Sequence, residues 1–178
     1  MQKVLLHACC AICAMYPVEK LISAGYLPTI YFFNPNIFPQ AEYQRRLEEL
    51  KKLCSKKNLE LVVAEEEHEK WLDYIKGYEQ EPERGLRCQK CFDYRLTKAA
   101  EFAHNNAFGL LTTTLTVSPH KRSEMIFASL ENACAKYDLK FLEYNFKKEN
   151  GFFKTNQLAD AEGFYRQTYC GCEFSKRD

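Results

Sequence analysis

Near the start of the chain stands the stretch KVLLHACCAIC, residues 3–13, which joins an apolar run to a group of cysteines. Residues 3–7 predict a short, fully buried strand, and apolar residues at helical spacing from Ala11 predict a helix that ends at Gly25. The cysteines therefore fall on a strand-to-helix turn. In an open parallel sheet such turns lie at the carboxyl edge, where ligands bind.

The same alternation of strands and helices continues along the chain. Further strands are expected at 29–33, 59–63, 108–115 and 139–144, and further helices at 39–58, at 66–76, after a loop at 80–85, at 119–137 and around 157–162. Ser118 and Pro119 suit the N-cap and the first residue of the helix over 119–137. This order predicts a single α/β domain over residues 1–178, with a Rossmann-like, mainly parallel sheet flanked by helices.

Composition limits the classes of protein to which the chain can belong. It has 178 residues, 46% hydrophobic and 14% aromatic, which excludes a disordered or collagen-like chain. No apolar run approaches the roughly 20 residues that cross a bilayer, and the amino terminus turns polar too early for a signal peptide. We therefore expect a soluble, cytoplasmic protein with no membrane partner. The net charge of +1 means that a polyanion would need a local basic patch.

The chain has 9 cysteines, most of which fall into three tight groups. The groups are Cys9-Cys10-x2-Cys13, Cys88-x2-Cys91 and Cys170-x-Cys172. The other two, Cys54 and Cys134, lie in helix-like stretches and are expected to be buried core thiols. Without an export signal, clustered cysteines indicate metal ligands or catalytic thiols rather than disulfides.

Spacing alone leaves three kinds of cysteine site open. A structural zinc site needs only four ligands, redox-active dithiols need a pair, and a larger set of soft donors favours an iron–sulfur cluster, with or without a second metal. Cys88 and Cys91 begin the helix after the loop at 80–85, where the helix dipole favours thiolate over thiol. The basic and aromatic segment 145–178 carries the third group and is expected to complete the site.

Polar residues near these groups are further candidates, each with a plain structural alternative. The threonine-rich end of the strand over 108–115 suits an anionic or hydroxyl-rich ligand, or simply satisfies strand propensity. Asp93 suits a metal ligand, a proton donor or a solvated carboxylate in the first turn of a helix. His7 and His120 flank the expected ligand loops and suit either catalysis or structural hydrogen bonds.

Basic residues alternate with aromatic ones toward the end of the chain. The runs are Phe146-Lys147-Lys148, Phe152-Phe153-Lys154 and Tyr165-Arg166-Gln167-Thr168-Tyr169, and Lys121-Arg122 adds a basic pair. Rings that stack beside cations are what unpaired RNA bases and their phosphates require.

Five blocks of sequence, taken together, resemble a known family. They are LLHACCAIC (5–13), YFFNPNIFPQAEYQRR (31–46), RCQKCFDYRL (87–96), TTTLTVSPHK (112–121) and GFYRQTYCGCEFS (163–175). In this order they resemble the iron–sulfur epoxyqueuosine reductases called QueH, over almost the whole chain. One departure is Ile12, where many members have proline, and this changes the stiffness of the loop rather than the ligands.

The resemblance implies a reaction and its cofactors. Members reduce the epoxide of epoxyqueuosine, at the wobble position of tRNA, to queuosine without cobalamin. They carry a [4Fe–4S] cluster with a further iron beside it, and they need an external electron donor. Carried onto this sequence, the resemblance implies as metal ligands Cys9, Cys10, Cys88, Cys91, Cys170 and Cys172, with Cys13 and Asp93 as additional candidates. It leaves open which of them hold the cluster and which the second metal.

The same resemblance gives expectations for the substrate site. Protons would come from Asp93, Tyr165 or Tyr169. The anticodon loop of tRNA can present an unpaired base. Contacts to the base and its phosphates are expected from Asn34, Asn36, Thr113, Thr114, Ser118, His120, Lys121, Lys147, Lys148 and Arg166, with Arg122 and Lys154 as further cations.

Two other functions compete with this hypothesis. One is a zinc-stabilised RNA-binding module without catalysis, which metal content would distinguish. The other is an ATP-dependent tRNA-thiolating enzyme, which uses a Gly/Ser-rich phosphate loop after its first strand. Here residues 7–11 read HACCA, with no glycine, which disfavours ATP binding.

Overall fold

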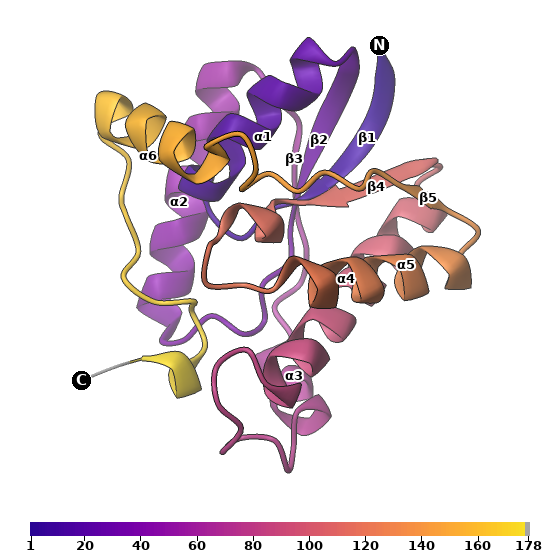
Figure 1. Ribbon diagram of the computed structural model, residues 1–178, viewed down its shortest axis with the longest axis vertical. Coiled ribbons are helices and arrows are strands. Elements are labelled where there is room, and N and C mark those ends of the chain that lie inside the picture. The colour runs from indigo at the N-terminus through magenta and orange to yellow at the C-terminus, as the bar shows by residue number, and fades with distance from the viewer. Residues whose placement is uncertain (177–178) are drawn as a thin grey trace.

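The computed structural model describes residues 1–176 as one α/β domain (Figure 1). Its strands are β1 (Gln2–His7), β2 (Tyr26–Phe32), β3 (Leu61–Val63), β4 (Leu110–Thr113) and β5 (Lys140–Phe141). Its α-helices are α1 (Ala11–Ser23), α2 (Gln40–Lys57), α3 (His68–Tyr74), α4 (Leu86–Asn105), α5 (Ser123–Lys136) and α6 (Gly151–Glu162). Two short 3-10 helices complete the described elements, η1 (Thr114–Val117) and η2 (Glu173–Ser175).

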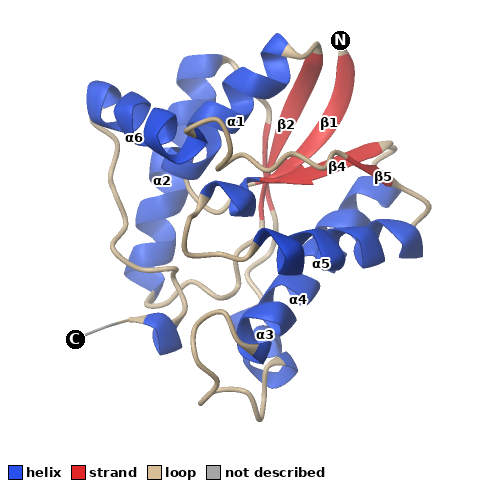
Figure 2. Ribbon diagram, in the orientation of Figure 1, coloured by secondary structure: helices blue, strands red, loops and turns tan. Residues whose placement is uncertain are grey.

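The strands form one parallel sheet in the order β3-β2-β1-β4-β5. β1 is central, with Leu6 paired to Ile30 of β2 and to Thr112 of β4. Helices lie on both sides of the sheet: α1, α2 and α6 gather on one side, and α4 and α5 on the other (Figure 2). The predicted single α/β domain with a parallel sheet is therefore confirmed. No helix within residues 1–176 is long and apolar enough to cross a membrane.

The core lies where the sequence pattern indicates. Val4, Leu5 and Leu6 are fully buried, because a central parallel strand has helices on both of its faces. Cys54 and Cys134 are also buried, as expected of core thiols.

The prediction that a helix starts at Pro119 is wrong by about one turn. After β4 the chain forms η1, and α5 begins at Ser123 with no side-chain cap. Ser118 instead accepts a hydrogen bond at Oγ from the backbone N–H of His120, at 3.2 Å, within the turn that precedes α5.

The strands expected at 108–115 and 139–144 are longer than the strands observed. Beyond Phe141, side-chain hydroxyls of threonine bind the backbone of the next segment. Thr112 Oγ1 donates to the carbonyl of Leu142 at 3.0 Å, and Thr116 Oγ1 donates to the carbonyl of Tyr144 at 2.9 Å. Threonine side chains on β4 and η1 thus bind a segment that the sequence pattern assigned to a strand.

The last helix begins earlier than expected, at Gly151 rather than near residue 157. A Cβ at Gly151 would lie 1.7 Å from the carbonyl oxygen of Phe146, so only glycine allows the chain to turn so closely into α6. α6 then packs beside α1 (Figure 1), which brings the carboxyl-terminal segment across the carboxyl edge of the sheet.

Candidate metal centre

The first cysteine group forms a compact cluster at the end of β1. Cys10 is the N-cap of α1, and its Sγ accepts from the backbone N–H of Cys13 at 3.4 Å. The sulfurs of Cys9, Cys10 and Cys13 all lie within 4.8 Å of one another. Cys9 and Cys10 are buried and Cys13 is half-buried, so the cluster is shielded from bulk water.

Buried polar residues hold this cysteine loop from behind. Thr114 Oγ1 accepts from the N–H of Cys9 at 3.4 Å and lies 3.7 Å from its Sγ. Asn34 Nδ2 donates to the carbonyl of Ala8 at 2.9 Å. His7 is fully buried between the Thr113 hydroxyl and the Phe33 carbonyl, and burial lowers the pKa of His7 to about 3. His7 is therefore a neutral structural histidine.

The other two cysteine groups meet each other on the far side of the pocket. Cys91 and Cys172 pack in one cluster with Trp71. Burial raises the pKa of both thiols, and the neighbouring charge of Cys170 raises each further.

Burial opposes the stabilisation of thiolates that the sequence analysis expects from the helix dipole at the start of α4. Burial raises the pKa of Cys88 and brings that of Cys91 to about 12. Desolvation of a buried thiolate exceeds the stabilisation that a helix terminus gives, because little water reaches the sulfur. Metal coordination would replace the lost solvation of these sulfurs.

Arg46 on α2 fixes the third cysteine group. Its guanidinium donates to the carbonyls of Tyr169 and Cys170, at 3.1 and 3.0 Å, and pairs with Glu42 at 2.7 Å. Gly171 has a φ of +123°, and a Cβ there would lie 3.1 Å from Arg46 Nη1. The turn between Cys170 and Cys172 is therefore closely fitted to Arg46.

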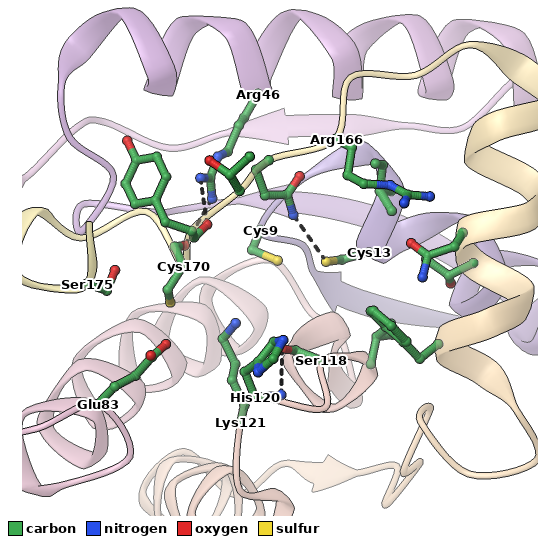
Figure 3. A pocket seen from close by; sticks show the side chains of 18 of the residues that line it. Cys9, Cys13, Arg46, Glu83, Ser118, His120, Lys121, Arg166, Cys170 and Ser175 are labelled. Carbon is green, nitrogen blue, oxygen red and sulfur yellow. Dashed lines mark hydrogen bonds between the residues drawn. The ribbon is translucent and has the colours of Figure 1, made fainter. Parts of the chain in front are cut away.

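A cavity of about 540 Å³ lies between the first and third cysteine groups (Figure 3). Cys9 and Cys13 line it on one side and Cys170 on another, and Lys121 points into the space between them (Figure 3). Although burial opposes a charge on Lys121, the neighbouring sulfurs of Cys170, Cys9 and Cys13 raise the pKa of its ammonium above the usual value. The sulfurs around Lys121 therefore favour its charged form.

Positive charge also lies behind the sulfurs. Arg95 is 2% exposed, donates to Asn34 Oδ1, lies 4.0 Å from Cys91 Sγ through Nη1, and leaves its Nε without a partner. None of the ion pairs between residues 1–176 includes it. A buried cation normally has an anionic partner. The residues therefore fit an anionic thiolate–metal centre.

All nine cysteines are free thiols, so the donor set is chemically intact. The sulfurs of Cys9, Cys10 and Cys13 lie close enough together to hold one metal ion, and the remaining clustered cysteines, Cys88, Cys91, Cys170 and Cys172, are further candidate ligands. Soft sulfur donors in this number suit iron and iron–sulfur clusters.

The three expected proton donors are engaged elsewhere. Asp93 Oδ1 accepts from Ser129 Oγ at 2.6 Å, and so faces α5 rather than the sulfurs. The hydroxyl of Tyr165 donates to Glu42 Oε2 at 3.0 Å. The hydroxyl of Tyr169 donates to the carbonyl of Phe38, although its side chain lines the pocket.

The expected substrate contacts divide into three sets. Those that line the pocket are Ser118, His120, Lys121 and Arg166. Those that are buried and do not line the pocket are Asn34, Asn36, Thr113 and Thr114. Lys147 is half-buried and donates to the carbonyl of Lys121, whereas Lys148 is exposed.

Two side chains that the sequence analysis did not assign also define the pocket. Phe152 lines it from α6 and is 41% exposed. Gln167 lines it from the carboxyl-terminal segment and contacts two cysteine sulfurs. Their signal in the sequence was weak: each lies in a basic and aromatic run without a motif of its own.

The fold and the pocket define a class of protein: α/β proteins that gather soft thiolate ligands at the carboxyl edge of a parallel sheet. Comparison with known sequences then gives the family. The sequence model described as epoxyqueuosine reductase QueH matches residues 4–178, and the chain belongs to this family of oxidoreductases.

Individual relatives agree over the full length of the chain. Epoxyqueuosine reductase QueH from Haemophilus influenzae is 42% identical over 177 residues, which cover 99% of this chain and 72% of the relative. The proteins of the same name from Acinetobacter baylyi and Thermotoga maritima are 38% and 34% identical, over 99% and 98% of this chain and 81% and 91% of the relatives.

A solved structure shares the fold at low identity. It is described as a predicted subunit of tRNA methyltransferase from Methanocaldococcus jannaschii, and aligns with a TM-score of 0.60 and 12% identity over 90% of this chain and 75% of its own. This likeness concerns the arrangement of strands and helices alone.

Proposed function

We propose that this protein reduces the epoxide of epoxyqueuosine in tRNA to the alkene of queuosine. The observation that carries the proposal is a pocket lined by Cys9, Cys13 and Cys170, with Cys91 packed in one cluster with Cys172, in a chain of the QueH family. Loss of the epoxide oxygen as water takes two electrons and two protons. A pocket lined by soft metal ligands suits a reaction of this kind.

The cofactor that we propose is a [4Fe–4S] cluster with a further iron beside it, held by the three cysteine groups. When bound, it would supply electrons one at a time and a Lewis-acidic metal, and an external donor would restore those electrons. The buried guanidinium of Arg95, which has an Nε without a hydrogen-bond partner and lies beside Cys91 Sγ, supports an anionic group at these sulfurs.

Lys121 is the residue that we place at the reacting oxygen. Its ammonium points into the space between Cys9 and Cys170, and although burial opposes its charge, the nearby sulfurs raise its pKa. A hydrogen bond from Lys121 Nζ would stabilise the negative charge that develops on the epoxide oxygen. The candidates for the donor of the second proton remain Asp93, Tyr165 and Tyr169. Each would have to give up a hydrogen bond within the protein to reach the substrate.

The rim of the pocket supports a nucleic-acid substrate. Exposed Phe152 and Phe153 stand on α6 beside Lys154, and Arg166 lies at the pocket itself. We propose that these rings stack on unpaired bases of the anticodon loop while the cations bind its phosphates.

One experiment tests the whole proposal. The protein is purified without oxygen, its iron and acid-labile sulfide are measured, and it is then given epoxyqueuosine-containing tRNA with a chemical reductant. We expect a brown protein that converts the modified base to queuosine. A colourless zinc protein that binds tRNA without turnover would replace the proposal with the RNA-binding alternative.

A further inference from the structure

Gln167 contacts two sulfurs of the first cysteine group. Its Nε2 lies 2.9 Å from Cys10 Sγ and 3.7 Å from Cys13 Sγ, and Figure 3 draws the contact at Cys13 as a dashed line. A carbonyl oxygen in the same position would face sulfur lone pairs, so the N–H end of the amide is the end that belongs there.

The chain holds Gln167 in place from both sides. On one side the N–H of Tyr165 donates to Glu49 Oε2 at 2.9 Å. On the other side Arg46 binds the carbonyls of Tyr169 and Cys170. Both anchors belong to α2, so Gln167 stands midway along a segment that is fixed to a rigid helix.

With its N–H groups directed to the sulfurs, the amide of Gln167 leaves its own carbonyl oxygen without a hydrogen bond. Gln167 Oε1 is buried and has no hydrogen-bond partner among residues 1–176. An unpaired buried carbonyl is unfavourable, so the side chain is not placed to satisfy its own hydrogen bonds. It is placed where its N–H groups meet Cys10, a residue only 2% exposed that bulk water does not reach.

We infer that Gln167 is a positioning residue that raises the reduction potential of the metal centre bound by Cys10 and Cys13. This inference rests on the proposed function, because it requires a redox metal at these sulfurs. Hydrogen bonds to ligand sulfur stabilise negative charge there, and the reduced state of the centre carries more of it than the oxidised state. Loss of the amide therefore shifts the potential to a more negative value.

The test is a redox titration of the anaerobically purified holoprotein with dithionite and mediators, followed by electron paramagnetic resonance and visible absorption. The variants are Gln167→Leu, which removes the donor at similar size, and Gln167→Glu, which also adds negative charge. Gln157→Leu is the matched control, because Gln157 is an exposed glutamine on α6. Iron and sulfide are measured for every protein.

We expect both Gln167 variants to keep their iron and sulfide and to show a more negative midpoint potential, with the larger shift in Gln167→Glu. Gln157→Leu should match the wild type. Variants with full iron content and an unchanged potential would overturn the inference, and so would loss of iron on removal of the amide, which indicates a role in metal retention alone. A wild-type protein without redox iron would instead overturn the proposed function.

Discussion

Arg46 Nη1 donates to the carbonyl oxygen of Cys170 at 3.0 Å, across 124 residues of sequence. The guanidinium is 1% exposed and also binds Glu42 and the carbonyl of Tyr169. The guanidinium reaches these acceptors from three separate nitrogens in one plane, whereas an ammonium carries all its donors on one nitrogen. Arg46 thus couples a surface helix to the position of the last cysteine group.

Arg46→Lys should therefore weaken both the fold and the metal centre. We expect a loss of about 1.5–3 kcal/mol in the free energy of unfolding, the range for one hydrogen bond to a charged group, together with a lower iron content. Urea denaturation and iron analysis measure the two effects. Arg45→Lys is the control, because Arg45 is exposed and stacks on Tyr165. Equal stability and iron in the two variants would contradict the coupling.

Gly171→Ala tests the same turn from the other side. Its φ of +123° disfavours a side chain, and the new Cβ would press against Arg46 Nη1 and Ile37 Cγ1, each 3.1 Å away. Gly163→Ala supplies the comparison, since Gly163 has a φ of +72° but nothing within 4 Å of a Cβ. We expect backbone strain of about 1–2 kcal/mol in both variants. Only Gly171→Ala should also lose iron, as measured after anaerobic reconstitution.

Much of this arrangement follows from patterns that a sequence displays. The apolar run 4–6 is buried as a central strand must be, and the spacing of the cysteines indicated a metal site at the carboxyl edge. These features depend on local order along the chain. They could be predicted because the spacing of apolar residues along one helix or strand determines which of its side chains are buried.

Other features depend on partners distant in sequence and could not be predicted. α5 starts late because Thr116 and its neighbours bind the segment after β5. Asp93 looked like a ligand from its distance to Cys91, but its position on α4 directs it toward Ser129. The contacts of Gln167 depend on anchors that α2 supplies.

Lys121→Met should slow turnover more than it changes the metal. Methionine keeps the length of the side chain but removes the charge and the donor that we propose at the reacting oxygen. We expect turnover to fall about 10²-fold or more, the usual contribution of a positioned proton donor. Lys140→Met is the control, since Lys140 is exposed at the start of β5 and its side chain does not line the pocket. Single-turnover assays at matched iron content measure the effect, and wild-type rates in Lys121→Met would exclude this role.

Tyr169→Phe separates a proton donor from a structural hydroxyl. The hydroxyl donates to the carbonyl of Phe38, so its loss should cost about 0.5–1.5 kcal/mol of stability and leave turnover close to wild type. Thermal unfolding and the single-turnover assay give the two values. A large fall in turnover with intact iron would instead restore Tyr169 as the donor of the second proton.

Binding of tRNA should depend on salt through cations at the carboxyl edge of the sheet. Lys148, Lys154 and Arg166 are exposed on or beside α6, and Arg166 also lines the pocket. Each contact to a phosphate of a single-stranded loop releases counterions, so the slope of log Kd against log salt should fall by about 0.7 for each contact removed. We therefore expect Lys148→Gln, Lys154→Gln and Arg166→Gln, combined in one protein, to flatten the slope by roughly 2.

The control uses cations at the opposite edge of the sheet. Lys3 and Lys140 are exposed near the amino ends of β1 and β5, so Lys3→Gln with Lys140→Gln lowers the net charge without touching the pocket rim. Because a uniform field would change the slope in proportion to the charges removed, three in the first set and two in the control, only a local patch predicts a change confined to the first set. Equal slopes for the two sets, measured by fluorescence anisotropy over a range of potassium chloride, would show that tRNA does not approach along α6.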